Sequence, residues 1–240
     1  MTASPPKAIL ITGAAQGLGQ AMALHLAAPN TLLLLHYRHS LEAIRHTAQQ
    51  AQAKGARTVL LQAELDDMAQ REQLMDQVAQ ATPSLSVLVN NVGVYHNLPL
   101  LDITPAQWQH TLDATLSSTF HLIQRARPLL LAAGSARIIN LGDAASDRIT
   151  ARTEATHYHM AKLGIHLLTR SFAKALAPAI TVNLISPGIL DNSVDGLNLP
   201  IPAGRTGHFS DVLSALDYLL SPQAQYVTGT NLLVAGGWNL

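Results

Sequence analysis

The sequence predicts an α/β protein with one doubly wound, parallel sheet of about seven strands and helices on both faces. Short apolar runs alternate with longer helical patterns along the 240 residues. The runs are continuously apolar rather than alternating, which is typical of strands buried on both faces. Repeated strand–helix units imply right-handed crossovers. No linker-like or low-complexity segment divides the chain, so we predict a single domain over residues 1–240.

The expected elements follow the chain in order. Strands are predicted at 8–12, 31–37, 58–62, 87–90, 137–141, 181–185 and 231–234. Helices are predicted at 18–27, 41–54, 68–81, 105–132, 154–176 and 210–220. The least regular stretch, 186–208, is rich in Pro, Gly and Asn, and we expect a loop with a short helix that covers the substrate pocket.

Composition excludes several classes of function. The chain has 48% hydrophobic and 12% charged residues with a formal net charge of zero, so neither nucleic acid nor an anionic membrane is an expected partner. It has no cysteine, which excludes disulfides, thiolate metal sites and thiol catalysis. No secretory signal pattern opens the sequence, and no apolar run reaches a membrane-spanning length. We therefore expect a soluble, cytoplasmic protein with a small-molecule substrate.

Three glycines lie between the first apolar run and the first helical pattern. Gly13, Gly17 and Gly19 have the spacing G-x-x-x-G-x-G. Bare backbone at a strand-to-helix turn lets a ligand approach closely, and the helix N-terminus offers free N–H groups suited to a pyrophosphate. The alternative is an ordinary tight turn, and the remaining motifs decide between the two.

Four motifs occur in order: TGAAQGLG (12–19), NNVG (90–93), YHMAK (158–162) and SPG (186–188). So arranged, they closely resemble the short-chain dehydrogenase/reductase family over essentially the whole chain. The resemblance implies a Rossmann-type sheet, a nicotinamide cofactor and a homotetramer. It also implies a set of cofactor-binding residues: Gly13, Gln16, Gly17, Leu18, Gly19, Asn91, Gly93, Tyr158, Lys162, Pro187 and Gly188.

The residues after the second strand bear on the choice of nicotinamide. NAD-selective relatives commonly carry an acidic residue there to hold the ribose hydroxyls, and this chain has none. Arg38 can instead make bidentate contacts to the 2′-phosphate, helped by Ser40. The alternative is an ordinary solvated arginine. We predict NADP(H).

Tyr158 and Lys162 are four residues apart, so they lie on one face of a helix. A phenol has a reference pKa of about 10. A neighbouring ammonium lowers that pKa by stabilising the phenolate. The resemblance implies that Tyr158 gives a proton to the substrate and that Lys162 also holds the nicotinamide ribose.

Two positions depart from the family pattern. Asp143 follows the fifth strand where a serine usually contacts the substrate carbonyl, and Ser146 is the nearest hydroxyl that can substitute. Thr115 stands where an asparagine usually holds a water beside the lysine. Both departures put the serine-assisted proton relay in doubt.

Asp143 followed by the Tyr–Lys pair resembles the pteridine reductases and dihydromonapterin reductases. In those enzymes a carboxyl group works with the tyrosine, which implies a catalytic role for Asp143. A flat pterin can sit between the nicotinamide and an aromatic ring such as Tyr95. Two features speak against this interpretation. Gly17 stands where those enzymes typically carry an arginine that contacts the pterin, and the spacing from Asp143 to Tyr158 is longer than in those enzymes by a couple of residues.

Two rival functions stay open. The stretches 201–205 and 226–238 resemble the ketoacyl-ACP reductase branch, although that branch asks for a serine at 143 and an asparagine at 115. A catalytically reduced NADP-binding regulatory protein is the second alternative.

Other polar residues receive structural readings. The 11 histidines include His157, His159 and His166, but no ligand spacing appears and we predict no metal. Asp66 and Asp67 are expected to begin a helix. Glu64 occupies a place near the adenine in the family, and the sequence does not define its role.

Overall fold

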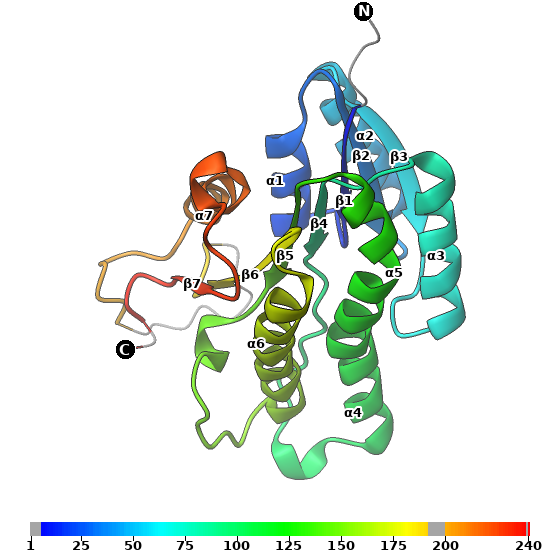
Figure 1. Cartoon of the computed structure of the whole chain (residues 1–240). Coiled ribbons are helices and arrows are strands. Elements are labelled where there is room, and N and C mark those ends of the chain that lie inside the picture. The colour runs from blue at the N-terminus through cyan, green and yellow to red at the C-terminus, as the bar shows by residue number, and fades with distance from the viewer. Residues whose placement is uncertain (1–5, 192–199, 239) are drawn as a thin grey trace, which may run out of the picture.

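The computed structural model describes residues 6–191, 200–238 and 240, and its centre is one parallel sheet. The strands lie in the order β3-β2-β1-β4-β5-β6-β7 (Figure 1). They are β1 (Lys7–Ile11), β2 (Thr31–Tyr37), β3 (Arg57–Gln62), β4 (Val87–Asn90), β5 (Ala136–Leu141), β6 (Ile180–Pro187) and β7 (Asn231–Val234). Each neighbouring pair is parallel. The predicted fold class and all seven expected strands are confirmed.

Helices cover both faces of the sheet (Figure 1). They are α1 (Gly17–Leu26), α2 (Leu41–Ala53), α3 (Met68–Ala81), α4 (Pro105–Leu112), α5 (Ser118–Ala132), α6 (Thr156–Leu176) and α7 (Phe209–Leu220). The prediction of one regular helix over 105–132 was wrong in detail. A π-helical segment, Asp113–Ser117, separates α4 from α5. Such segments are frequent at functional sites.

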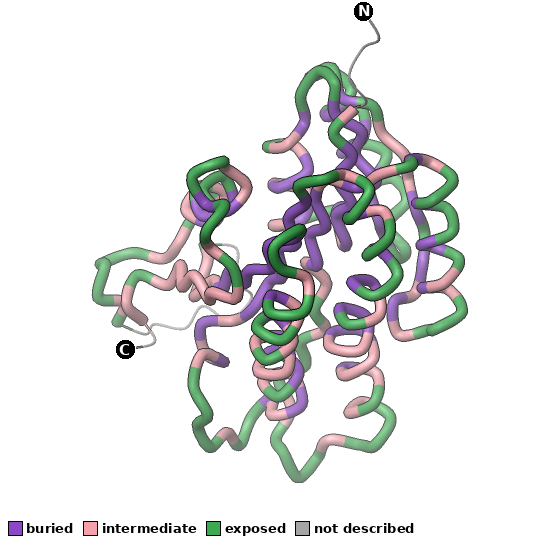
Figure 2. The backbone as a smooth tube through the Cα atoms, viewed as in Figure 1, coloured by how far each residue is buried: buried purple, intermediate pink, exposed green. Residues whose placement is uncertain are grey.

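Two apolar layers hold the helices onto the sheet. In β2, Leu33 and Leu35 face a cluster formed with α1, α2 and α7. Leu32 and Leu34 face the opposite cluster, formed with α3, α5 and α6. Figure 2 shows these central strands as the most continuously buried part of the chain. Each fully buried leucine contributes about 1.5–3 kcal/mol, so the apolar run of β2 anchors both layers.

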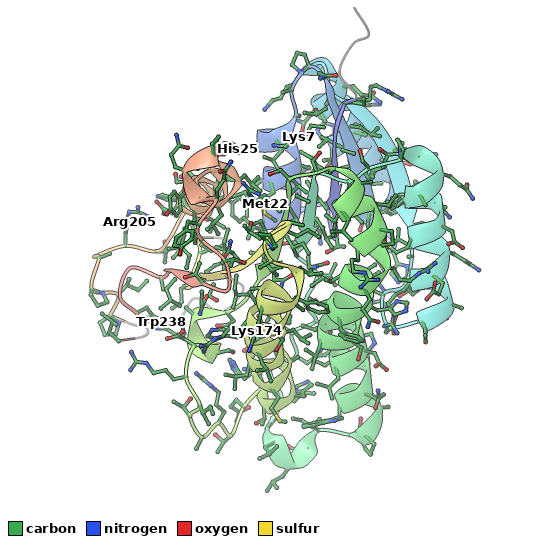
Figure 3. All side chains as sticks on the ribbon, in the orientation of Figure 1. Lys7, Met22, His25, Lys174, Arg205 and Trp238 are labelled. Carbon is green, nitrogen blue, oxygen red and sulfur yellow. The ribbon has the colours of Figure 1, made fainter. Side chains whose placement is uncertain are left out.

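Local signals set the ends of several elements. The Asp67 side chain caps α3 by accepting from the Gln70 N–H at 3.0 Å, as expected for a residue that begins a helix. Thr104 and Gln107 form a capping box on α4. On the opposite face, His25 of α1 contacts Asp217 of α7 at 2.7 Å and ties these helices together (Figure 3).

The topology fixes where a ligand can bind. The strand order reverses between β1 and β4, and ligands of open α/β sheets bind at the carboxyl ends of strands at that point. The predicted covering loop, 186–208, lies partly outside the described residues, because positions 192–199 are not described. Within the described ranges, no helix is long and apolar enough to cross a membrane.

Candidate active site

The glycine turn leaves the N-terminus of α1 bare. Gly13 and Gly17 have φ of +66° and +59°, the left-handed region that glycine adopts without strain. A Cβ on Gly19 would lie 2.1 Å from the Gly13 carbonyl oxygen, so only glycine fits there. The N-cap residue Gln16 makes no side-chain capping bond, and the first turn has no acidic residue. The turn therefore presents free N–H groups to an anion.

Asn91 holds this turn from the neighbouring strand end. Its side-chain amide donates to the Thr12 carbonyl oxygen at 2.9 Å. The Thr12 hydroxyl accepts from the main-chain N–H groups of Asn91 and Val92 at 2.9 and 3.2 Å. The NNVG motif thus connects the carboxyl ends of β1 and β4. Asn91, which we expect to bind the cofactor, also fixes the shape of the glycine turn.

His36 also supports the glycine turn, a role that the sequence analysis did not predict. Its Nδ1 accepts from the Gly13 N–H at 3.1 Å, and its Nε2 donates to the Ala63 carbonyl oxygen at 3.1 Å. Burial lowers the pKa of His36 to about 4, so the neutral ring keeps one donor and one acceptor. The available signal was a polar residue at the end of a continuously apolar strand.

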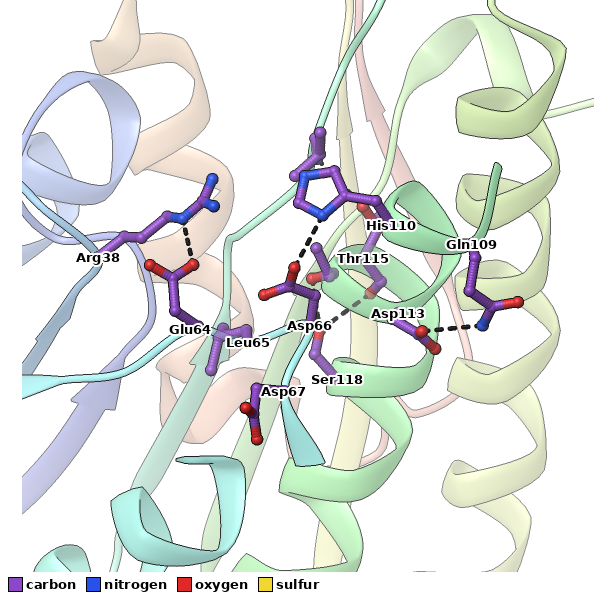
Figure 4. Close-up of polar contacts among 12 residues, drawn as sticks. Arg38, Glu64, Leu65, Asp66, Asp67, Gln109, His110, Asp113, Thr115 and Ser118 are labelled. Atoms are coloured by element: carbon purple, nitrogen blue, oxygen red, sulfur yellow. Dashed lines mark hydrogen bonds and ion pairs between the residues drawn. The ribbon is translucent and has the colours of Figure 1, made fainter. Parts of the chain in front are cut away.

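Arg38 and Ser40 lie exposed at the end of β2, beside a pocket of about 360 Å³. Arg38 lines that pocket together with Gly13, and its Nε donates to Glu64 (Figure 4). Ser40 is the N-cap residue of α2 but makes no side-chain capping bond, so its hydroxyl is available to a ligand. Asp66 also lines the pocket, and its Oδ2 lies 2.8 Å from His110 Nδ1.

Tyr158 and Lys162 lie together on α6. The Lys162 Nζ is 5.7 Å from the centre of the Tyr158 ring and donates to the Leu141 carbonyl oxygen at 2.7 Å. Burial lowers the pKa of Lys162 to about 8, although Asp143 opposes the shift. A Cβ on Gly93 would lie 3.0 Å from this ammonium, so that glycine makes room for the lysine.

Asp143 reaches the same point from the end of β5. Its carboxylate accepts a hydrogen bond from the Tyr158 hydroxyl and another, at 2.6 Å, from the Ala145 N–H. Burial and this carboxylate raise the pKa of Tyr158 well above 10. The lowering that the sequence predicted from the neighbouring Lys162 ammonium was therefore wrong, because burial and the Asp143 charge dominate. The phenol is therefore protonated at neutral pH, with its hydrogen directed at a carboxylate.

Ser146 and Thr115 are engaged elsewhere. The Ser146 hydroxyl lies 2.9 Å from His159 Nδ1 and is buried, so the structure pairs it with a histidine rather than with Tyr158. The Thr115 hydroxyl accepts from the Val94 N–H at 3.1 Å, within the π-helical segment. Neither contact was visible in the sequence.

The remaining predicted site residues lie in three places: beside Tyr158, at the ends of β6 and β7, and on α1. The half-exposed ring of Tyr95 meets the Tyr158 ring edge-on, with centroids 5.0 Å apart. Pro187 ends β6, and Gly188 donates to the Val234 carbonyl oxygen at 3.0 Å. A Cβ on Gly188 would lie 2.8 Å from that of Ala235, so β6 and β7 meet closely there. Leu18, in the first turn of α1, is partly buried and packs against the core.

The histidines do not assemble a metal site in the part of the chain described. No group of three or more His, Asp or Glu residues there is placed to hold a metal ion. His157 is fully buried and makes no hydrogen bond from either ring nitrogen, and its ring stacks against His96 with centroids 6.4 Å apart.

Comparisons with known proteins show which proteins this chain resembles. A family model described as enoyl-(acyl carrier protein) reductase matches residues 13–239. A 3-oxoacyl-[acyl-carrier-protein] reductase from Staphylococcus aureus (strain Mu50) is 32% identical, over 96% of this chain and 97% of the relative. A related reductase from Synechocystis is 31% identical over 99% of this chain and 98% of its own length.

Solved structures give the same picture. A short-chain dehydrogenase from Burkholderia cenocepacia J2315, in complex with NADP, superposes with a TM-score of 0.89 at 28% identity and covers 98% of both chains. An acetoin dehydrogenase from Salmonella typhimurium superposes with a TM-score of 0.87 at 26% identity, over 97% of this chain and 96% of its own.

Proposed function

Because the chain belongs to the short-chain dehydrogenase/reductase family, we propose that it is an NADP(H)-dependent reductase of C=O or C=N bonds, with a pteridine-like substrate favoured. The observation that carries the substrate class is the carboxylate of Asp143 on the hydroxyl of Tyr158. Family membership supports oxidoreductase chemistry, and the side chains of the site support the finer proposal.

The residues present fit a dinucleotide phosphate. The bare N-terminus of α1 suits the pyrophosphate, because Gln16 makes no side-chain capping bond and, among the described residues, no atom lies within 4 Å of the position that a Cβ on Gly17 would take. Arg38 and Ser40 stand where a 2′-phosphate is expected, and the Burkholderia relative was solved with NADP. Asn91, Gly93 and Gly188 shape the walls of the groove. When bound, NADP(H) supplies a hydride to the substrate.

In the proposed mechanism Tyr158 is the proton donor. Its raised pKa keeps the phenol protonated before reaction, and the buried ammonium of Lys162 stabilises the phenolate that remains when the proton moves to the substrate oxygen or nitrogen. With a pKa of about 8, Lys162 is charged in most molecules at pH 7. Asp143 orients the phenol and offers an acceptor beside it.

That acceptor favours a pterin over a ketoacyl group. A ketone brings only an acceptor to the site, whereas the amino-pyrimidine edge of a pterin carries N–H donors that a carboxylate can accept. A ketoacyl substrate that displaces the phenol contact would leave the Asp143 carboxylate with the Ala145 N–H but with no donor in place of the phenol. Tyr95 adds a ring against which a flat heterocycle can pack.

The experiment is a turnover panel. The purified protein is tested for NADPH oxidation with dihydrobiopterin, acetoacetyl-CoA and quinones, beside Asp143→Ala and Asp143→Ser. Pterin reduction that falls in both variants supports the proposal. Unchanged pterin reduction in both removes Asp143 from the mechanism.

Two rival outcomes have their own readouts. The 3-oxoacyl reductase relatives favour a ketoacyl substrate as the second candidate, which predicts turnover of acetoacetyl-CoA that improves in Asp143→Ser. Tight NADPH binding without turnover on any compound would instead identify a regulatory NADP-binding protein.

We also propose a homotetramer. Exposed apolar residues gather on α5 and α6, among them Phe120, Leu131 and Leu167, the last with two thirds of its surface exposed. Such surfaces are typical of interfaces between subunits. Light scattering after size-exclusion chromatography tests the proposal: a mass near four times 25.6 kDa supports it, and a monomer mass contradicts it.

A further inference from the structure

Glu64 sits at the centre of a three-residue contact beside the pocket. Arg38 Nε donates to one carboxylate oxygen, and His39 Nε2 lies 3.1 Å from the other. Arg38 also lines the pocket, as do Gly13 and His36. Its contact with Glu64 is drawn in Figure 4. Among the described residues that line the pocket, Arg38 is the one Lys or Arg side chain, and it is already paired with a carboxylate.

The same three residue types meet a second time on the far side of the sheet, between α3 and α5. Arg125 Nε lies 2.7 Å from one oxygen of Glu72, and His121 Nε2 lies 2.9 Å from the other. There the guanidinium is also bonded at its end, because Arg125 Nη2 donates to Asp76 at 3.2 Å. The guanidinium of Arg125 is thus bonded both at Nε and at Nη2, and we call these residues the closed trio.

The trio of Arg38, His39 and Glu64 at the pocket differs from the closed trio at the end of the guanidinium. Across the described ranges, the two terminal nitrogens of Arg38 have no hydrogen-bond partner, and only its Nε is engaged, with Glu64. A guanidinium bound through Nε keeps its two terminal nitrogens free for a bidentate contact with a phosphate. Glu64 thus orients Arg38 and at the same time cancels its charge.

We propose that Glu64 is a specificity-determining residue that limits the preference for NADPH over NADH. The inference rests on the proposed use of NADP(H). A phosphomonoester carries about −1.5 to −2 charges at pH 7, so a carboxylate on the phosphate-binding arginine opposes its binding. NADH has no 2′-phosphate, so it does not experience this repulsion.

Glu64→Gln separates the two roles of the side chain. The amide oxygen still accepts from Arg38 Nε, while the negative charge is gone. Unit charges a few ångströms apart in water interact strongly enough to change an affinity by about fivefold. Glu64→Gln should therefore bind NADPH about fivefold more tightly and NADH within about twofold of the parent. Salt should shrink the difference.

The test is calorimetric titration of the full-length protein with NADPH and NADH, which needs no turnover. Glu72→Gln is the matched control, because it removes the same charge from the closed trio and should leave both affinities unchanged. Glu64→Ala is the second variant: it removes the charge but also releases Arg38, so its gain in NADPH affinity should be smaller than that of Glu64→Gln.

The outcomes separate the two levels of the argument. Parent protein that binds neither nucleotide would refute the proposed function itself. Parent protein that binds NADPH, with Glu64→Gln showing unchanged or weaker NADPH affinity, would overturn the role of Glu64 and leave the proposed function standing. An equal gain in Glu72→Gln would also overturn it, by showing a general effect of net charge.

Discussion

On the β1–β2 side of the candidate site a glycine turn presents main-chain N–H groups, whereas the β5–α6 side carries buried ionisable side chains. The first region depends on glycines, such as Gly19, and on neutral supports, such as His36 with its pKa near 4. The second depends on Tyr158, Lys162 and Asp143, where burial and charge shift the pKa of the tyrosine upward and that of the lysine downward.

This difference separates binding from chemistry. The glycine turn should respond to added volume, and its support by His36 should not change between pH 5 and 9, because that ring stays neutral there. The ionisable region should respond to charge and pH. Changes in one region should therefore move nucleotide affinity, and changes in the other should move the rate of turnover.

The largest expected effect comes from Tyr158→Phe, which removes the proton donor and keeps the ring. We expect turnover to fall by about a thousandfold, within the range for loss of a general acid. NADPH affinity should stay within about twofold of the parent, since the ring still packs against Tyr95. Steady-state kinetics and calorimetry check the two halves of the statement. Substantial residual turnover would contradict the assignment.

The next effect tests the main-chain region. An added Cβ in Gly19→Ala would lie 2.1 Å from the Gly13 carbonyl oxygen and 2.7 Å from the Asn91 side chain, so the turn must shift. We expect NADPH affinity to fall by about a hundredfold, a free-energy loss within the range for overpacking. Gly17→Ala meets nothing within 4 Å but places an alanine at a φ of +59°, so it reports the effect of backbone strain without a clash. An equal loss in both variants would argue against the clash.

The third effect concerns stability and its dependence on pH. The pKa of Lys162 falls from 10.5 to about 8 on folding. Below pH 8 the lysine is charged in both states, so burial of the charge destabilises the folded protein in full. Between pH 8 and 10.5 the unfolded chain holds the proton more strongly, and the free energy of unfolding rises with pH.

Lys162→Met should therefore inactivate the enzyme and yet stabilise it. At pH 7 we expect a gain of about 1–3 kcal/mol, bounded by the shift of about 2.5 pKa units. The gain should shrink at pH 9.5, where the parent lysine is mostly neutral. Urea unfolding at both pH values measures it. A destabilised variant with a gap independent of pH would show that the contact with Leu141, not the charge, dominates.

The smallest effect tests the phosphate contact. Arg38→Ala should weaken NADPH binding by about tenfold and leave NADH binding within about twofold, because only NADPH presents the 2′-phosphate. Titration of both nucleotides checks the ratio. Equal losses for both nucleotides would place Arg38 against a part of the nucleotide that they share.

Much of the fold was predictable because it follows from local pattern. The run of leucines in β2 is buried on both faces, as continuous apolarity indicates. Three of the four motifs lie at the carboxyl ends of β1, β4 and β6, where the topology places a ligand, and the fourth lies on α6, from which Lys162 reaches the end of β5 at Leu141. The π-helical segment at 113–117 was not predictable, since neither proline nor glycine interrupts 105–132 before Pro128.

The side-chain contacts of the site were less accessible to sequence reading. The Asp143–Tyr158 contact joins the end of β5 to α6, and the pairing of Ser146 with His159 uses the hydroxyl that sequence left as a substitute for the family serine. In the sequence, His36 is only a polar residue near the end of an apolar strand. Its contact with the Gly13 N–H exists only in the folded turn. Each depends on tertiary packing between segments that no local pattern connects.

The most direct measurement is a crystal structure of the protein with NADPH. The account predicts the pyrophosphate against the first N–H groups of α1, the 2′-phosphate on Arg38, and the Tyr158 hydroxyl facing the nicotinamide ring. A nucleotide bound elsewhere, or a Tyr158 hydroxyl directed away from the nicotinamide, would contradict it.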